Sequence, residues 1–393
     1  MTHGARRVGV IVLALAAWAG ASPGADPQIR PVSEAELRAA IDDLGRLDYA
    51  TRMTASRTVR RAPASLAVRT LMNAATEHVD GYVRYRALVL LSGFNDPRAR
   101  DIMETALGDP NDRLRAVAYA YFEHNPDLTV VPLLLAALDK ESSEFVRPQL
   151  TRALAAYGSD PRVRAALVPL VDRGQDFFRA VVIEALGDYK AAYARDPIDR
   201  IARLEGPLKD DAALALGKIG GERSLTTLAE LQRSASRQEQ PAIAAGICLL
   251  GVNCASHVPF IVASLEFGMD HIGYADLVRA ASHALATVAV ADYPDVAATL
   301  FDLGVPARDP ARAPIALAVG FVAIRHTPLL MTVLEQRADL DGAVLLLRDA
   351  FDMLEEDYAE ERFFATVRRT YWQAAEGSAT RRVADALIQR LEF

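Results

Sequence analysis

The amino-acid sequence predicts an all-α protein, an α-solenoid of about nine to ten helical hairpins with capping helices at its two ends. Two observations lead to this prediction. A pattern of apolar residues recurs with a period near 32 residues, and each period holds two amphipathic segments of helical spacing. The composition agrees with it, because 51% of the residues are hydrophobic and alanine and leucine dominate, as in a packed helical protein.

Residues 1–21 are predicted to be a secretory signal peptide. Arg6 and Arg7 precede an uncharged apolar run, Val8–Ala21, which is shorter than the roughly 20 residues of an ordinary transmembrane helix. The run ends in Ala-Gly-Ala, the small-x-small pattern of a cleavage site, so residues 22–32 are expected to begin the mature chain as a flexible linker. The alternative is a signal anchor that is not cleaved.

Residues 33–47 are predicted to form an N-terminal capping helix. Ser33 and Glu36 have the S-x-x-E spacing of a capping box, in which each side chain binds the backbone of the other residue. Leu37, Ile41 and Leu44 follow at helical spacing and give the helix one apolar face. That face is expected to cover the first hairpin.

Residues 48–340 are predicted to be the solenoid of repeats. The first helix of each repeat has a mostly small residue four positions after its starting position and apolar residues seven and eight positions after it, so these side chains share one stripe of the helix. Small residues in the stripe let the next helix approach closely. The starting positions lie 30 to 35 residues apart: Thr51, Val83, Leu114, Val146, Phe178, Leu208, Ala242, Leu277 and Ala311.

A second amphipathic segment follows each first helix, with turns expected near Gly93, Gly158, Gly187 and Gly251. One hairpin cannot bury both its apolar faces, whereas stacked hairpins share a continuous core. Nine of them predict a curved rod on the order of 90 Å long, at an interaxial distance of about 10 Å. Residues 341–393 are predicted to hold a degenerate tenth repeat and C-terminal capping helices, the last of them beginning after Ser378.

The repeats resemble the short HEAT-type repeats of phycobilisome-lyase-like and many bacterial scaffold proteins. Phe178-Arg179 followed by Ala185-Leu186-Gly187 is the best copy of the motif, and the resemblance covers residues 48 to 340. It implies a right-handed superhelix. It also implies that a column of cationic residues pairs with acidic groups or backbone carbonyl groups along the stack, whereas the alternative for this column is an anion-binding strip. The column is Arg52, Arg84, Arg115, Arg147, Arg179, Lys209 and Arg312.

Cys248 and Cys254 are the two cysteines of the chain, and His257 lies close after them. In an oxidising compartment the two cysteines are expected to form a local disulfide, and two free buried thiols are the alternative. The set also contains acceptable zinc ligands, but it lacks the tight paired spacing of a zinc ribbon. No metal site is therefore predicted here.

Other polar clusters are interpreted as structural. The acidic stretch Glu355, Glu356, Asp357, Glu360 and Glu361 lacks the alternating ligands of an EF-hand loop and is predicted to be a solvated helix start. Two isolated histidines are expected to be surface or hydrogen-bonded groups, and no nucleophile motif accompanies them: His283 and His326. The sequence thus predicts no catalytic residues and no cofactor.

The predicted function is a non-catalytic protein-interaction scaffold in the periplasm or outside the cell, with the concave face of the solenoid, expected to be lined by the second helices, as the binding surface. The alternative is an enzyme or enzyme subunit like the HEAT-repeat chromophore lyases. Removal of Arg6 and Arg7 changes the formal charge from −7 to −9, which disfavours nucleic-acid binding. A protein partner is expected, without membrane insertion once the signal is cleaved.

Overall fold

The computed structural model describes residues 31–354 and 357–393, and over these residues the chain is all-helical, without strands. This confirms the predicted fold class. The predicted signal peptide, residues 1–21, and residues 22–30 of the predicted linker lie outside the described residues. The 22 α-helices and three short 3-10 helices are α1 Glu34–Asp43, α2 Tyr49–Arg61, α3 Ala64–Glu77, α4 Gly81–Ser92, α5 Ala99–Ala106, α6 Asp112–His124, η1 Leu128–Val130, α7 Val131–Leu138, α8 Arg147–Ala155, α9 Pro161–Leu167, η2 Val168–Val171, α10 Asp176–Asp188, η3 Ala192–Ala194, α11 Arg195–Ala202, α12 Lys209–Ile219, α13 Glu222–Gln232, α14 Gln240–Leu249, α15 Cys254–Asp270, α16 Ala275–Val290, α17 Pro294–Gly304, α18 Arg312–Arg325, α19 Thr327–Glu335, α20 Leu340–Phe351, α21 Asp357–Gln373 and α22 Ala379–Leu391.

Nine helical hairpins, α2–α3 to α18–α19, stack side by side along the described chain. The predicted starting positions of the first helices all fall at or near the first turn of an even-numbered helix. The capping box also forms, since Ser33 Oγ accepts from the Glu36 amide and the Glu36 carboxylate accepts from the Ser33 amide. Gly187 itself lies in α10, and the turn expected near it follows directly, at Tyr189 and Lys190.

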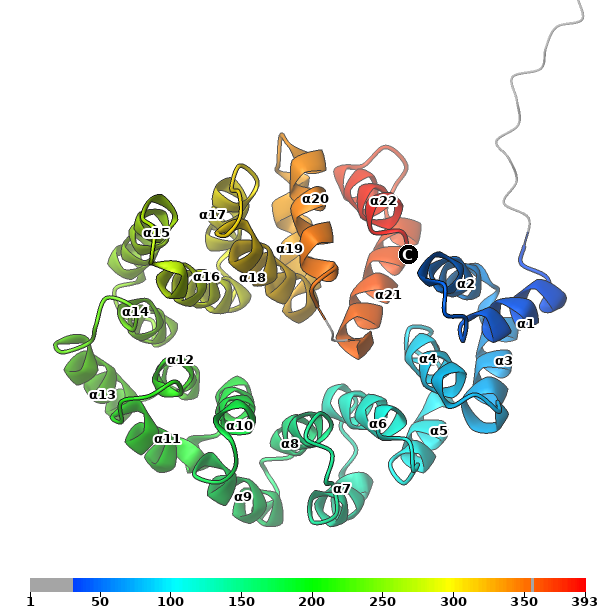
Figure 1. Ribbon diagram of the computed structural model, residues 1–393, viewed down its shortest axis with the longest axis horizontal. Coiled ribbons are helices and arrows are strands. Elements are labelled where there is room, and N and C mark those ends of the chain that lie inside the picture. Colours follow the sequence, from blue (N-terminus) through cyan, green and yellow to red (C-terminus); the bar gives the residue numbers. More distant parts are fainter. Residues whose placement is uncertain (1–30, 355–356) are drawn as a thin grey trace, which may run out of the picture.

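The first helices of the hairpins, not the second ones, line the inside of the curve (Figure 1). The prediction that the second helices line the concave face was therefore wrong. Glycines in the stripe explain the difference, because they bring neighbouring first helices into backbone contact. A Cβ on Gly217 would lie 2.5 Å from the Gly246 Cα, and one on Gly187 would lie 2.8 Å from the Ala215 Cα. The more closely spaced helices must lie on the shorter, inner side of a bend.

The curvature brings the two ends of the solenoid together (Figure 1). After α20 stacks on α18, helix α21 lies against α4 and α6, and α22 packs on α19, α20 and α21. The molecule is thus a closed ring rather than the predicted curved rod. The C-terminal helices cap the last hairpin, and α21 also joins it to the first hairpins.

Candidate functional site

A pocket of about 890 Å³ opens on the inside of the ring, where its two ends meet. Helices α4, α6 and α8 form one wall, and the start of α21 forms the other. We call it the inner pocket. Its lining is rich in aromatic side chains, and one of them, Phe145, has 91% of its surface exposed. The aromatic residues of the lining are Tyr49, Tyr82, Tyr85, Phe145, Tyr358 and the imidazole His124.

A buried ion pair holds α21 against the first hairpins. Glu361 Oε2 accepts from Arg60 Nη2 at 2.6 Å and from Arg60 Nε at 2.9 Å, and the two side chains are only 1% and 4% exposed. Arg368 Nη1 lies 3.5 Å from the other carboxylate oxygen of Glu361. The Arg60 guanidinium also lies over the Phe364 ring, 5.0 Å from its centroid. Glu361 is therefore the counter-charge of two buried guanidinium groups.

The first turn of α21 makes the next contacts of the closure. Asp357 accepts hydrogen bonds from the Tyr85 hydroxyl and from Arg86. The Tyr358 ring stacks on His124 with a centroid distance of 5.8 Å, and Asn125 Nδ2 donates to the Tyr358 hydroxyl at 3.3 Å. Burial raises the pKa of the Tyr358 hydroxyl, so it stays protonated.

These contacts correct the prediction that the acidic stretch is a solvated helix start. Asp357 and Glu361 face the N-terminal hairpins, while Glu355 and Glu356 lie outside the described residues. Sequence reasoning missed Arg60, because its partner is 301 positions away and no repeat pattern relates the two. The available hint was the loss of the repeat after α20, followed by a helix that begins with carboxylates.

Ion pairs join the C-terminal ends of the inner helices α6, α8, α10 and α18. Arg152, at the end of α8, lies 2.9 Å from Asp188 and 3.4 Å from Glu123. Arg325, the last residue of α18, reaches across to Glu184 of α10 at 3.8 Å. Cations near helix C-termini are favourable because of the helix dipole. We call this network the hub: Glu123, Arg152, Glu184, Asp188, Lys218 and Arg325.

Burial near the hub, together with the surrounding charges, shifts the pKa values of His124 and Asp211. Burial lowers the pKa of His124 to about 4, with further lowering by the nearby charges of Arg362, Arg325 and Arg152. The imidazole is therefore neutral at pH 7. Burial also raises the pKa of Asp211 on α12 to about 7, assisted by the charge of Glu184.

The column of cationic residues binds the loops between repeats, as the resemblance implied. Arg115 pairs with Glu141 through two bonds of 2.8 Å and donates to the Asp109 carbonyl oxygen at 2.8 Å. Arg52, Arg84 and Arg179 also donate to backbone carbonyl oxygens of the segment just before their own helix. The same holds for Arg312, whereas Lys209 pairs with two carboxylates, those of Glu205 and Glu239.

Arg147 is the exception, because its guanidinium lies over the Phe178 ring at 4.8 Å and its Nε has no hydrogen-bond partner among the described residues. We therefore expect Arg115→Ala to lower the free energy of unfolding by about 1–3 kcal/mol, the cost of losing charged hydrogen bonds. Arg147→Ala is expected to cost about 1 kcal/mol, as for a cation–π contact. Urea unfolding of both variants checks whether Arg115→Ala lowers the free energy of unfolding more than Arg147→Ala does. Equal decreases would contradict this expectation.

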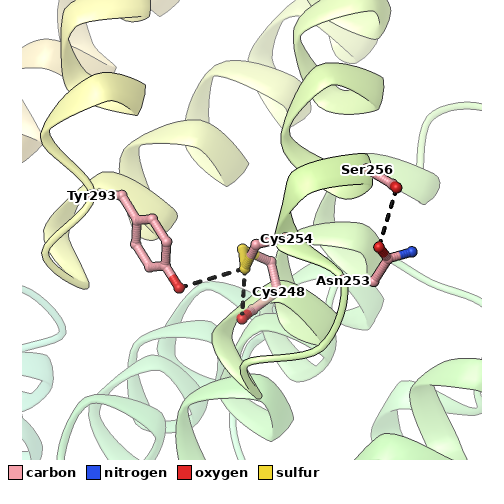
Figure 2. The surroundings of a disulfide bond; sticks show 5 residues. All are labelled: Cys248, Asn253, Cys254, Ser256 and Tyr293. Carbon is pink, nitrogen blue, oxygen red and sulfur yellow. Dashed lines mark hydrogen bonds between the residues drawn. A yellow bond between two sulfur atoms is a disulfide. The ribbon is translucent and has the colours of Figure 1, made fainter.

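Cys248 and Cys254 are joined by a disulfide, with Cα atoms 4.5 Å apart. Figure 2 shows the bond between the end of α14 and the start of α15, with the Tyr293 hydroxyl oxygen 3.5 Å from Cys254 Sγ. Neither sulfur is then available as a thiolate ligand with His257. Within residues 31–354 and 357–393, no three or more His, Cys, Asp and Glu side chains are grouped to hold a metal ion.

The two isolated histidines have structural contacts. His326 Nδ1 accepts from the Leu329 amide at 3.1 Å and so caps α19, and His283 packs edge-on against Phe321.

In the part of the chain that the structure describes, no single helix has the length and apolar composition of a membrane span. The pair α18 and α19 meets both criteria together, with a bend of 116° between them.

The stacked hairpins and their closure define an α-solenoid ring. Residues 107–187 match the family model of HEAT repeats, and residues 208–234 match that of the PBS lyase HEAT-like repeat. The chain thus carries HEAT repeats, including one of the PBS lyase type. HEAT-repeat solenoids generally serve as protein-interaction scaffolds.

Several solved structures are similar to the chain. They include YibA of E. coli, at 17% identity over 56% of this chain and 83% of that one, with a TM-score of 0.42. The complex of CpcE and CpcF of phycocyanin lyase from Nostoc sp. PCC7120 has 16% identity over 65% and 94%, and a TM-score of 0.40. Kap121p bound to Nup53p has 12% identity over 91% of this chain and 50% of that one, and a TM-score of 0.44. No curated protein matches the chain by sequence.

Proposed function

We propose that the chain is an exported, non-catalytic scaffold that binds a protein partner on the inner face of its ring. The observation that carries this proposal is the inner pocket, which combines a volume of about 890 Å³ with exposed aromatic side chains. Aromatic residues and arginines dominate the energetics of protein interfaces, and both occur in this lining. The net charge of −7 disfavours nucleic acid as the ligand.

Phe145 offers the sharpest test of the binding face. It stands just before α8 and lines the inner pocket, whereas Phe177, at the corresponding position of the next repeat in the first turn of α10, is 67% exposed and does not line it. A photo-reactive phenylalanine analogue at position 145 should cross-link the same discrete envelope protein in repeated preparations, and one at position 177 should not.

The matched substitutions give the strength of the contact. Phe145→Ser is expected to weaken capture of that partner at least about tenfold, since a buried aromatic anchor contributes about 2 kcal/mol or more to binding. Phe177→Ser should leave capture unchanged. Similar cross-linking at both positions, or none at either, would place the partner elsewhere.

Export is proposed from the pattern of residues 1–21 and from the disulfide, a bond that persists in oxidising compartments. Mass spectrometry of protein from the cell envelope should find a new amino terminus after Ala21. Cys248 and Cys254 should not react with alkylating reagents until a reductant is added. Reduction should lower stability by only about 1–2 kcal/mol, because the bond closes a short loop. An intact Met1 with two free thiols in the cytoplasm would contradict the proposal.

A further inference from the structure

The carboxylates that line the inner pocket already have partners within the chain. Glu123 accepts from Gln149 Nε2 at 2.7 Å and from the Tyr189 hydroxyl at 3.1 Å. Asp357 accepts from Tyr85 and Arg86, and Asp112 accepts from the Ser143 hydroxyl at 3.1 Å. Glu360, which completes the set, also interacts within the chain. A cationic ligand would have to displace these partners.

The arginines of the same lining retain unused donors. The Arg113 guanidinium is exposed and makes no ion pair with any described residue, and it lies 5.6 to 5.8 Å from the ring centroids of Tyr82 and Tyr85. Arg325 has one long ion pair, with Glu184 at 3.8 Å, and lies over the Phe321 ring at 5.4 Å, and its buried Nε has no hydrogen-bond partner among the described residues. The free hydrogen-bonding capacity of the pocket is therefore cationic.

The two arginines lie at opposite ends of α6. Arg113 is on the first turn of this helix, and Arg325 pairs with Glu184 in the hub, where Arg152 joins Glu184 to Glu123 on the last turn of α6. Eleven residues at 1.5 Å per residue separate these ends by about 16 Å. An extended peptide advances about 3.3 Å per residue, so two carboxylates about five positions apart would reach both guanidinium groups.

We propose that the inner pocket recognises an extended acidic segment of the protein partner, with carboxylates about five residues apart that pair with Arg113 and Arg325 and an aromatic or apolar side chain between them. The intervening side chain packs against Tyr82 and Phe145. Charge-assisted, bidentate pairing of guanidinium with carboxylate supplies the specificity. This proposal rests on the proposed scaffold function and names the chemistry of its partner.

The test uses labelled hexapeptide probes and fluorescence anisotropy on the full chain. The probe Glu-Ala-Tyr-Ala-Ala-Glu should bind at least tenfold more tightly than the same peptide with glutamine in place of both glutamates, and a lysine version should not bind. Moving the two glutamates next to each other should weaken binding severalfold. Higher salt should weaken binding of the acidic probe.

Arg325→Gln should reduce binding of the acidic probe at least tenfold, and the exposed Arg113→Gln about three- to tenfold. Arg337→Gln is the matched control, because Arg337, like Arg325 over Phe321, lies over a phenylalanine ring, that of Phe301 at 5.1 Å, outside the inner pocket. Arg113→Gln keeps the test decisive if Arg325→Gln does not fold. Equal binding of the glutamate and glutamine probes, or no effect of Arg113→Gln, would overturn the proposal.

The outcomes separate this inference from the proposed function. If cross-linking at position 145 captures a protein but the acidic probe fails, the interface stands and its carboxylate chemistry is wrong. If citrate competes as well as the peptide and position 145 captures no protein, the pocket takes small acids, and both the scaffold function and the peptide proposal fail.

Discussion

Glu361→Gln is expected to lower the free energy of unfolding by about 3–5 kcal/mol, the usual cost of removing one partner of a buried ion pair. The variant leaves the Arg60 and Arg368 guanidinium groups buried without their counter-charge, although the side chain keeps its shape. Because α21 closes the ring through this contact, the variant should also open it. Urea unfolding followed by circular dichroism measures the first effect.

Spin labels at Arg57 and Glu392, whose side chains lie 3.6 Å apart across the closure, measure the second effect as a longer and broader distance distribution. Glu104→Gln is the matched control, since Glu104 makes an i,i+4 ion pair with Arg100 and is 40% exposed. Exposed pairs of this kind contribute about 0.3–0.5 kcal/mol. Equal losses for Glu361→Gln and Glu104→Gln, or an unchanged label distance, would show that another contact closes the ring.

The closure rests more on polar contacts than on apolar packing. The apolar core that begins at Leu37 in α1 runs continuously through the hairpins to Ile247, and beyond that point Tyr358 is the one buried side chain among the described residues that belongs to it. The rest of α21 meets the first hairpins mainly through Asp357, through Glu361 and through the Phe364 ring under the Arg60 guanidinium. Buried pairs are little screened by salt, so we expect the ring to stay closed at physiological ionic strength.

The sequence predicted the features that depend on neighbours in the chain. The capping box predicted from the spacing of Ser33 and Glu36 forms at the start of α1. The period of about 32 residues located all nine hairpins, because each repeat must present the same apolar stripe to the next. These properties are local and recur along the chain.

The candidate site could not be predicted in this way, because it depends on how small bends add up over many repeats. Arg60 and Glu361 look like ordinary exposed charges in the sequence, and only the closed ring makes them partners. The inner pocket likewise brings together Phe145, just before α8, and Arg325, the last residue of α18. The small residues of the stripe were recognised, but their number alone does not fix the angle between adjacent repeats.

Gly217→Ala is expected to destabilise the ring by about 1–3 kcal/mol, the cost of forcing extra volume into a close-packed contact. The new methyl group would lie 2.5 Å from the Gly246 Cα and carbonyl oxygen, and backbone cannot yield as a flexible side chain can. The gain of about 1 kcal/mol in helix propensity on replacing glycine with alanine is included in this net value. Helices α12 and α14 must therefore separate on the inner side of the curve.

Gly108→Ala is the control for Gly217→Ala. Its Cβ would meet nothing closer than the Thr105 carbonyl oxygen at 3.9 Å, so the change should be neutral or stabilise the fold by up to about 1 kcal/mol, through a smaller unfolded-state entropy. Thermal unfolding compares the two variants. Small-angle scattering should show a larger radius of gyration for Gly217→Ala alone, because spreading two inner helices flattens the curve and pulls α21 away from α4. If Gly217→Ala is as stable as Gly108→Ala and as compact, close approach of the inner helices does not set the curvature, and the cause must lie in the outer layer.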